Sequence, residues 1–135
     1  MNGWKEYEDF VSGMTSDVSS STRTMCEHLT TLQSDHDEMN MALLLTSSLG
    51  LSAESGEFTE IVKKIVFQGK PLNEETRFHL QRELGDVIWY WMNACRSLRL
   101  NPTDVIQENM RKLHKRFPNK VFSIHDSENR DEHDL

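Results

Sequence analysis

The six residues Gln68-Gly69-Lys70-Pro71-Leu72-Asn73 separate two stretches with the hydrophobic periodicity of helices. Glycine suits a helix C-cap because it adopts the left-handed backbone conformation at little cost, and Pro71 prevents the helix from continuing. Asn73, which two glutamates follow, suits the start of a new helix. The pattern therefore predicts a helical hairpin whose turn lies at these residues.

Both arms of the predicted hairpin carry apolar side chains at helical spacing. The stripe of the first arm is Leu44, Ser48, Leu51, Ser55, Phe58, Val62, Ile65 and Val66. The stripe of the second arm is Leu84, Val87, Ile88, Trp91, Cys95 and Leu98. Such stripes are typical of amphipathic helices that bury one face. Since no strand pair or repeat is evident elsewhere, we expect an all-α fold.

Two acidic pairs lie at equal distances from the turn, Glu54 with Glu57 and Glu83 with Asp86. Residues three apart project from the same side of a helix. If the two arms are antiparallel, the four carboxylates reach one level of the hairpin, where they repel one another unless a cation is bound. Oxygen ligands without a nearby His or Cys favour Mg²⁺, or Mn²⁺ in its place, over zinc. A single pair of this kind is often only solvated charge, so the prediction depends on both pairs meeting.

The acidic pairs belong to longer motifs that resemble the MazG-like nucleoside triphosphate pyrophosphohydrolases of the all-α NTP pyrophosphatase superfamily. These motifs are Gly50-Leu51-Ser52-Ala53-Glu54-Ser55-Gly56-Glu57, Lys63-Lys64, Arg82-Glu83-Leu84-Gly85-Asp86-Val87-Ile88-Trp89-Tyr90, Asn109-Met110-Arg111-Lys112-Leu113 and Arg116-Phe117-Pro118. The resemblance covers roughly residues 40–123 and departs at Ala53, where many members have a further Glu.

The resemblance implies an enzyme that hydrolyses a nucleoside triphosphate, often a deoxynucleotide, to the monophosphate and pyrophosphate. Glu54, Glu57, Glu83 and Asp86 would bind the divalent metal, and a metal-activated water would attack the α-phosphorus. Glu54 or Glu57 would act as the catalytic general base. A related dUTPase or phosphoribosyl-ATP pyrophosphohydrolase, or a non-catalytic metal-binding helical module, remains an alternative.

The phosphates of such a substrate require cations, because the four acids repel them. Lys64 lies about two helical turns beyond Glu57 on nearly the same face. The resemblance further implies that Asn109, Lys112 and Arg116 face the triphosphate or the metal. Basic side chains in the last turn of a helix are also favoured by the helix dipole alone, which is the alternative for this segment.

The family forms dimers, often dimers of dimers, whose helices pack into shared four-helix bundles. The resemblance therefore implies a homo-dimer or homo-tetramer with sites built partly from the neighbouring chain. A single hairpin with short flanking helices would leave apolar surface exposed, which agrees with that expectation. Candidate interface residues are Phe58, Ile65, Val87 and Trp91.

The length of 135 residues indicates a single domain, which we place at residues 1–123. The remaining residues, 124–135, are acidic and lack apolar spacing, so we expect a disordered tail. The acidic N-terminus and the absence of a long apolar run predict a cytoplasmic protein with no membrane partner. The net charge of −7 argues against nucleic-acid binding. The two cysteines, Cys26 and Cys95, are expected to be buried free thiols.

Helical spacing in the first third of the chain predicts a short helix around residues 4–11 and a second helix from about Thr22 to Gln33. Residues 12–24 are rich in Ser, Thr and Gly and predict a loop or a weakly helical bridge. The start of the long acidic helix is expected at 35–38. The last helix is expected to begin with Asn101 as its cap and Pro102 at its first position.

Overall fold

The computed structural model describes residues 3–128, and every regular element within them is a helix. The all-α prediction is thus confirmed. The helices are α1 (Gly3–Met14), α2 (Asp17–Ser20), α3 (Thr22–Asp35), α4 (Met41–Gln68), α5 (Glu74–Ser97), α6 (Pro102–Arg116) and α7 (Ile124–Glu128). None of these helices combines the length and the apolarity that crossing a bilayer requires.

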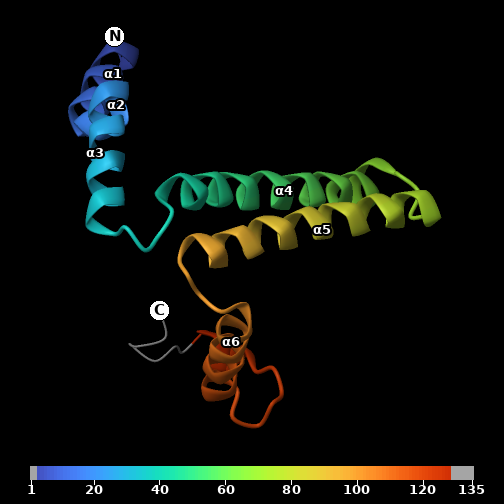
Figure 1. Cartoon of the computed structure of the whole chain (residues 1–135). Helices are drawn as coiled ribbons and strands as arrows, with labels where there is room; N and C mark the ends of the chain where they lie inside the picture. Colours follow the sequence, from blue (N-terminus) through green and yellow to red (C-terminus); the bar gives the residue numbers. More distant parts are fainter. Residues whose placement is uncertain (1–2, 129–135) are drawn as a thin grey trace.

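Helices α4 and α5 form the predicted antiparallel hairpin and lie side by side along their lengths (Figure 1). Gly69 ends α4 in the left-handed conformation, with φ of 70°. Asn73 caps α5, and its Oδ1 accepts a hydrogen bond of 2.9 Å from the backbone N–H of Thr76. Local capping chemistry therefore fixes the turn where the sequence predicts it.

The flanking helices leave the hairpin at the end opposite its turn (Figure 1). Helices α1, α2 and α3 lie together on one side of the hairpin axis, and α6 lies on the other side. Asn101 caps α6 and Pro102 occupies its first turn, as predicted. Among residues 3–128, only the pairs α4–α5, α2–α3 and α3–α4 make more than marginal contact.

The start of the long helix was predicted wrongly. Helix α3 continues to Asp35, and α4 begins at Met41 with Asn40 as its cap. The Gln33 amide bridges this connection, because its Nε2 donates to the Met39 carbonyl at 2.8 Å and its Oε1 accepts from the Met41 N–H at 3.0 Å. The backbone N–H of Asn40 also donates to the Ser97 carbonyl at 2.8 Å, which ties the start of α4 to the end of α5.

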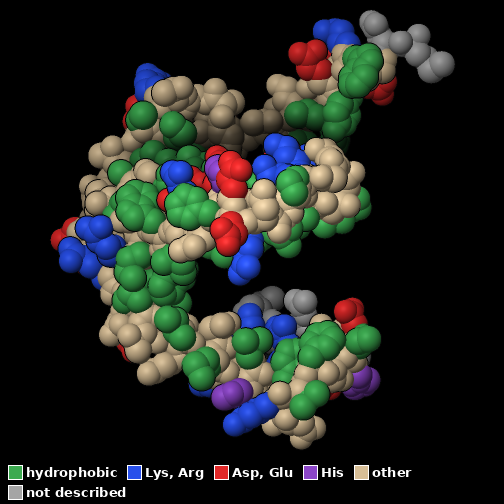
Figure 2. Space-filling view, turned by 90° about the vertical axis from the view of Figure 1, so that its right-hand side faces the viewer, with side chains coloured by type: hydrophobic (Ala, Val, Ile, Leu, Met, Phe, Trp, Pro, Cys, Tyr) green, Lys and Arg blue, Asp and Glu red, His purple; other side chains and the backbone are tan. Residues whose placement is uncertain are grey.

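The chain buries little apolar surface. Cys95 is the one apolar side chain that is buried among the described residues, whereas the buried polar side chains are Ser47, Thr76, Asn93 and Ser97. Leu84 and Ile88, which belong to the predicted apolar stripe of α5, are 51% and 59% exposed. Several apolar side chains of the two helices, such as Phe58 and Trp91, are half-buried, and others remain on the surface (Figure 2).

The Tyr90 ring of α5 packs directly on Gly50 of α4. A Cβ atom placed on Gly50 would lie 2.1 Å from the Cε1 atom of Tyr90, so the ring occupies the space that any larger residue would need. The Tyr90 ring also packs edge-to-face on Trp89, with 4.7 Å between the ring centroids. Glycine at this position lets α5 approach the backbone of α4.

Two further predictions concern the cysteines and the tail. Cys95 is buried as predicted, but Cys26 is exposed, because α3 packs on little more than the single turn of α2 and the start of α4. Helix α7 occupies the first five residues of the predicted tail. The rest of that tail, 129–135, lies outside the described residues.

Candidate metal centre

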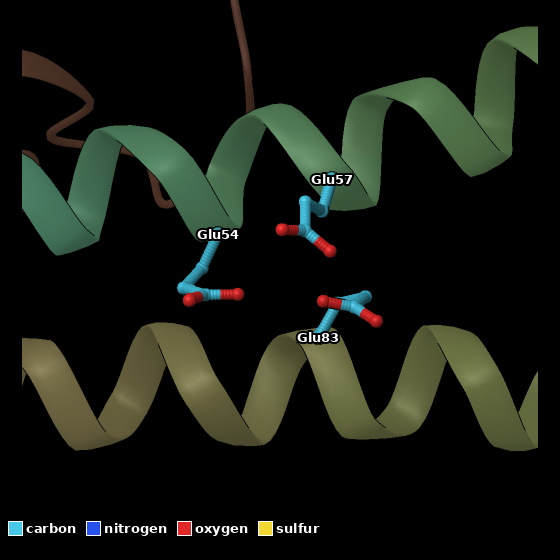
Figure 3. A group of neighbouring side chains, drawn as sticks. All are labelled: Glu54, Glu57 and Glu83. Atoms are coloured by element: carbon cyan, nitrogen blue, oxygen red, sulfur yellow. The ribbon is translucent and has the colours of Figure 1, made fainter.

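Three glutamates converge between the two long helices. Glu54 and Glu57 project from α4 toward α5, and Glu83 projects from α5 toward them (Figure 3). One carboxylate oxygen of each lies within 4.8 Å of the others. Glu54 and Glu83 are half-buried, whereas Glu57 is exposed. The structure thus brings together three of the four acids at the level of the hairpin that the sequence indicated.

The fourth acid, Asp86, lies outside this group of three. Its side chain is one methylene shorter than a glutamate, and the residue is exposed. Its charge nevertheless acts on Glu54, because it is one of the carboxylates that raise the pKa of that residue. Asp86 therefore lies at the edge of the acidic group rather than at its centre.

The surroundings of Glu54 disfavour its charged form. Partial burial between the helices is the largest cause that raises the pKa of Glu54, and repulsion by Glu57, Asp86 and Glu83 raises it further. Every cause acts in the same direction. An acid in such a position is relieved either by a proton or by a bound cation.

Lys63 and Lys64, which follow Glu57 on α4, both form ion pairs with Glu60. The Glu60 carboxylate contacts Lys63, and its Oε1 lies 3.2 Å from the Nζ of Lys64. Hydrogen bonds from Lys63 and then from Lys64 lower the pKa of Glu60. Lys64, predicted from the sequence to bind phosphate, is therefore held by a carboxylate one helical turn beyond Glu57.

The other residues that were expected to bind phosphate lie away from the acids of their own chain. Asn109, Lys112 and Arg116 belong to α6, which makes at most marginal contact with α4 or α5. Figure 1 shows α6 to one side of the hairpin, below α5 and near the end that is opposite the turn. Within one chain, the structure does not bring α6 together with the acidic group.

The acidic group fits a hard divalent cation. All of its donors are carboxylate oxygens, the ligand type that Mg²⁺ and Mn²⁺ prefer. Neighbouring oxygens around an octahedral Mg²⁺ lie about 3 Å apart and opposite ones about 4 Å, so the three carboxylates would move closer together to hold one ion. Glu54, Glu57 and Glu83 would be its ligands.

Two contributors to this region were not predicted from the sequence. Glu60 holds Lys64, and its position one turn before that lysine was the available signal. Tyr90 packs on Gly50 beside the acids. Gly50 and Tyr90 are equidistant from the turn, as the acidic pairs are, so the same symmetry would have predicted their contact.

Comparisons with known proteins agree with this geometry. The sequence model of the MazG nucleotide pyrophosphohydrolase domain matches residues 44–121, which include the whole hairpin site and α6. The Gene 37 protein of Mycobacterium phage L5 is 39% identical over 70 residues, which amount to 51% of this chain and 61% of that protein. The chain therefore spans less than two thirds of the length of this relative. No solved structure matches the chain.

The family match covers more than half of the chain and includes each acid of the candidate centre. The all-helical structure and the converging glutamates are consistent with it. The chain therefore belongs to the MazG nucleotide pyrophosphohydrolase domain family.

Proposed function

We propose that the protein hydrolyses a nucleoside triphosphate, in particular a deoxynucleotide, to the monophosphate and pyrophosphate. The convergence of Glu54, Glu57 and Glu83 between two antiparallel helices is the observation that carries this proposal. Acidic side chains at such a spot repel both one another and a polyphosphate, so they are useful to a hydrolase only when a cation joins them to the substrate.

We infer that Glu54, Glu57, Glu83 and Asp86 hold Mg²⁺, for which Mn²⁺ can substitute. A divalent ion bound there would neutralise phosphate charge and acidify a coordinated water. The half-buried positions of Glu54 and Glu83 limit the water around these carboxylates, which strengthens their interaction with a cation.

In the proposed reaction, water adds to the α-phosphorus and the bond from that phosphorus to the oxygen bridging to the β-phosphorus breaks. Pyrophosphate carries away the electron pair of the broken bond. One carboxylate, Glu54 or Glu57, accepts the proton of the attacking water as general base. Both side chains project from α4 toward α5, where Glu83 faces them (Figure 3).

We propose that Lys64 and the α6 residues Asn109, Lys112 and Arg116 bind the phosphates. Lys64 would exchange its ion pair with Glu60 for a phosphate oxygen. Because α6 lies away from the acids of its own chain, its residues would serve the acidic group of a second copy. This arrangement explains how a strongly acidic site acquires the cations that a triphosphate needs.

We propose that the protein is a homo-dimer or a homo-tetramer in which two hairpins form a four-helix bundle. The apolar residues Leu84 and Ile88 on α5 are exposed, and so is Leu49 on α4. A chain of this size normally buries a sizeable apolar core, whereas here only Cys95 is buried among the described apolar side chains. A second hairpin would cover these side chains.

A panel of canonical and deoxynucleoside triphosphates, incubated with Mg²⁺ or Mn²⁺, tests the activity. We expect release of pyrophosphate rather than phosphate. In water labelled with oxygen-18, the label should enter the monophosphate, because attack occurs at the α-phosphorus. Label in the pyrophosphate, or release of phosphate, would contradict the proposed reaction.

Variants of the acids test the site. We expect Glu57→Gln and Asp86→Asn to lower kcat by roughly a hundredfold or more, because each removes charge that holds the ion. Glu75→Gln is the matched control, since Glu75 lies in the first turn of α5 at the turn end of the hairpin. Loss of activity in the control, or retained activity in both site variants, would count against the assignment.

Mixing experiments test whether two copies build one site. Glu57→Gln and Lys112→Ala should each be inactive alone, but mixed dimers should contain one intact site. We expect recovery of roughly a quarter of the wild-type activity after subunit exchange. No recovery despite exchange would place Lys112 in the same chain's site or outside the site.

The substrate panel also separates the alternatives. A related dUTPase or phosphoribosyl-ATP pyrophosphohydrolase would use the same four acids but turn over one nucleotide class. A non-catalytic helical module would bind Mg²⁺ or Mn²⁺ in calorimetry and would release no pyrophosphate from any nucleotide.

A further inference from the structure

Helix α1 carries an apolar stripe that the rest of the described chain leaves exposed. The stripe consists of Trp4, Tyr7, Phe10, Val11 and Met14. All residues of α1 are exposed, and Trp4 is 87% exposed. Helix α1 lies outside residues 44–121, which match the MazG family, so nucleotide chemistry does not account for this stripe. Five large apolar side chains on one helix face indicate a surface that binds another surface.

The segment formed by α6 and the residues after it carries a second exposed apolar surface. A cavity of about 300 Å³ lies there, and its lining includes Met110, Leu113, His114, Phe117, Lys120 and Phe122. The rings of Phe117 and Phe122 pack on each other with 5.7 Å between centroids, yet Phe122 is 71% exposed. The cavity is therefore an apolar, partly aromatic surface with cationic groups in its lining.

The two surfaces match in length and in charge. From Trp4 to Met14 the stripe of α1 extends about 15 Å, and the apolar stripe of α6 from Ile106 to Phe117 extends about 17 Å. Helix α1 contains three acids and one lysine, whereas α6 contains four arginines and lysines and two acids. Lys120 adds a positive charge beside the cavity, and α7 adds the two acids Asp126 and Glu128, so residues 102–128 still carry one more positive than negative charge. Two copies of the acidic helix α1 would repel each other, so the charges favour α6, and not a second α1, as the binding partner of α1.

We propose that the apolar stripe of α1 docks in the α6 cavity of a second copy of this chain. Helices α1 and α6 of one chain lie on opposite sides of the hairpin axis, so contact between copies brings the two surfaces together without rearranging the chain (Figure 1). Phe10 and its neighbours fill the cavity, while the acids Glu6 and Glu8 lie near Lys120. The docked α1 would hold α6 in place against the second copy.

Disulfide crosslinking tests this contact directly. Two variants are made in the Cys26→Ser background, which removes the exposed thiol and leaves the buried Cys95. One carries Phe10→Cys in α1, and the other carries Phe122→Cys beside the cavity. After mixing and mild oxidation, we expect a covalent dimer in which mass spectrometry identifies the peptide pair 10–122.

A matched control carries Lys115→Cys, which lies on the face of α6 opposite Leu113 and Phe117. Its crosslink to Phe10→Cys should be at least about tenfold less abundant, because the proposed contact keeps that face away from α1. Equal yields from both positions would show only random collision and would overturn the proposal. Predominant 10–10 crosslinks would show pairing of α1 with α1, which also overturns it.

A single chain that carries both Phe10→Cys and Phe122→Cys distinguishes contact between copies from contact within one chain. At high dilution we expect little disulfide within one chain, whereas efficient closure there would overturn the proposal in favour of an intramolecular contact.

Charge reversal supplies a second measurement. Glu6→Lys with Glu8→Lys should lower the 10–122 yield at least about tenfold, and Lys120→Glu in the second chain should restore part of it. None of these readouts depends on nucleotide hydrolysis, so this proposal and the proposed function can fail separately.

Discussion

At the level of single residues, Glu54 connects the stability of the protein to its ligand. Its pKa is raised by partial burial and by three neighbouring carboxylates. The folded protein therefore binds more protons than the unfolded chain between the ordinary value of 4.5 and the raised value. In the metal-free protein, stability should fall as the pH rises through that window, and the penalty should be fully present above it.

We expect Glu54→Gln to stabilise the metal-free protein at neutral pH, because it removes the charge that the site disfavours. The thermal midpoint should rise, and its decrease as the pH rises above 4.5 should weaken. The same variant should lose the increase in midpoint that Mg²⁺ gives to the wild type. Circular dichroism melts with chelator and with Mg²⁺ measure both effects, and a lower metal-free midpoint would contradict the electrostatic argument.

Gly50 is the second position where one residue has a large effect. We expect Gly50→Ala to destabilise the protein by about 1–3 kcal/mol, because its methyl group would overlap the Tyr90 ring and force the helices apart. Urea unfolding measures the change. Gly56→Ala is the matched control in the same helix, since a Cβ there meets no atom within 4 Å. That change should instead stabilise by about 0.5–1 kcal/mol through helix propensity.

The double variant Gly50→Ala with Tyr90→Ala should be less destabilised than the sum of the two single variants, because the alanine methyl group no longer meets the ring. An additive double variant would show that the ring is not what limits the approach of the two helices.

At the level of elements, the turn between α4 and α5 depends on two caps. We expect Gly69→Ala to cost about 1 kcal/mol, because an alanine adopts the left-handed conformation at φ of 70° only with strain. Gly69→Asn should cost less, since asparagine tolerates that conformation better than alanine does. Denaturant titration of both variants gives the comparison, and equal losses would argue that the glycine acts through something other than its backbone.

The elements that local chemistry specifies were predictable from the sequence. Gly69, Asn73 and Asn101 act on backbone groups only a few residues away. The C-terminus of α4 and the N-termini of α5 and α6 could therefore be placed without knowledge of the fold. The level at which the acids meet was also predictable, because two helices that share a short turn have little freedom of register.

The packing face of α5 was predictable only in part. Within the apolar stripe that helical periodicity identifies, Cys95 is buried and Val87, Trp91 and Leu98 are half-buried. Leu84 and Ile88, which belong to the same stripe, are exposed. Asn93 is buried instead, where its Nδ2 donates to the Trp89 carbonyl and its Oδ1 accepts from Arg96. Periodicity measures apolarity alone, whereas the contact of Gly50 with the Tyr90 ring also depends on how the two helices pack on each other. The direction of α6 was equally hidden, because the short connection before it contains no signal for an angle.

At the level of the whole molecule, the chain has too little buried apolar surface to resemble an independent domain. If copies associate through the exposed apolar side chains, unfolding is linked to dissociation. We expect the thermal midpoint to rise with protein concentration, and light scattering to give the mass of a dimer or a tetramer. A constant midpoint together with a monomeric mass would contradict the proposed assembly.

The position of the acidic level along the hairpin has a consequence for the order in which the protein forms. A hairpin that closes from its turn meets Glu57 and Glu83 before it reaches the contact between Gly50 and Tyr90. Like charges must therefore come together before the tightest packing is available to compensate for them, and the barrier to folding should lie near that step. A divalent cation would lower this barrier as well as stabilise the product, so magnesium should accelerate refolding and not merely slow unfolding.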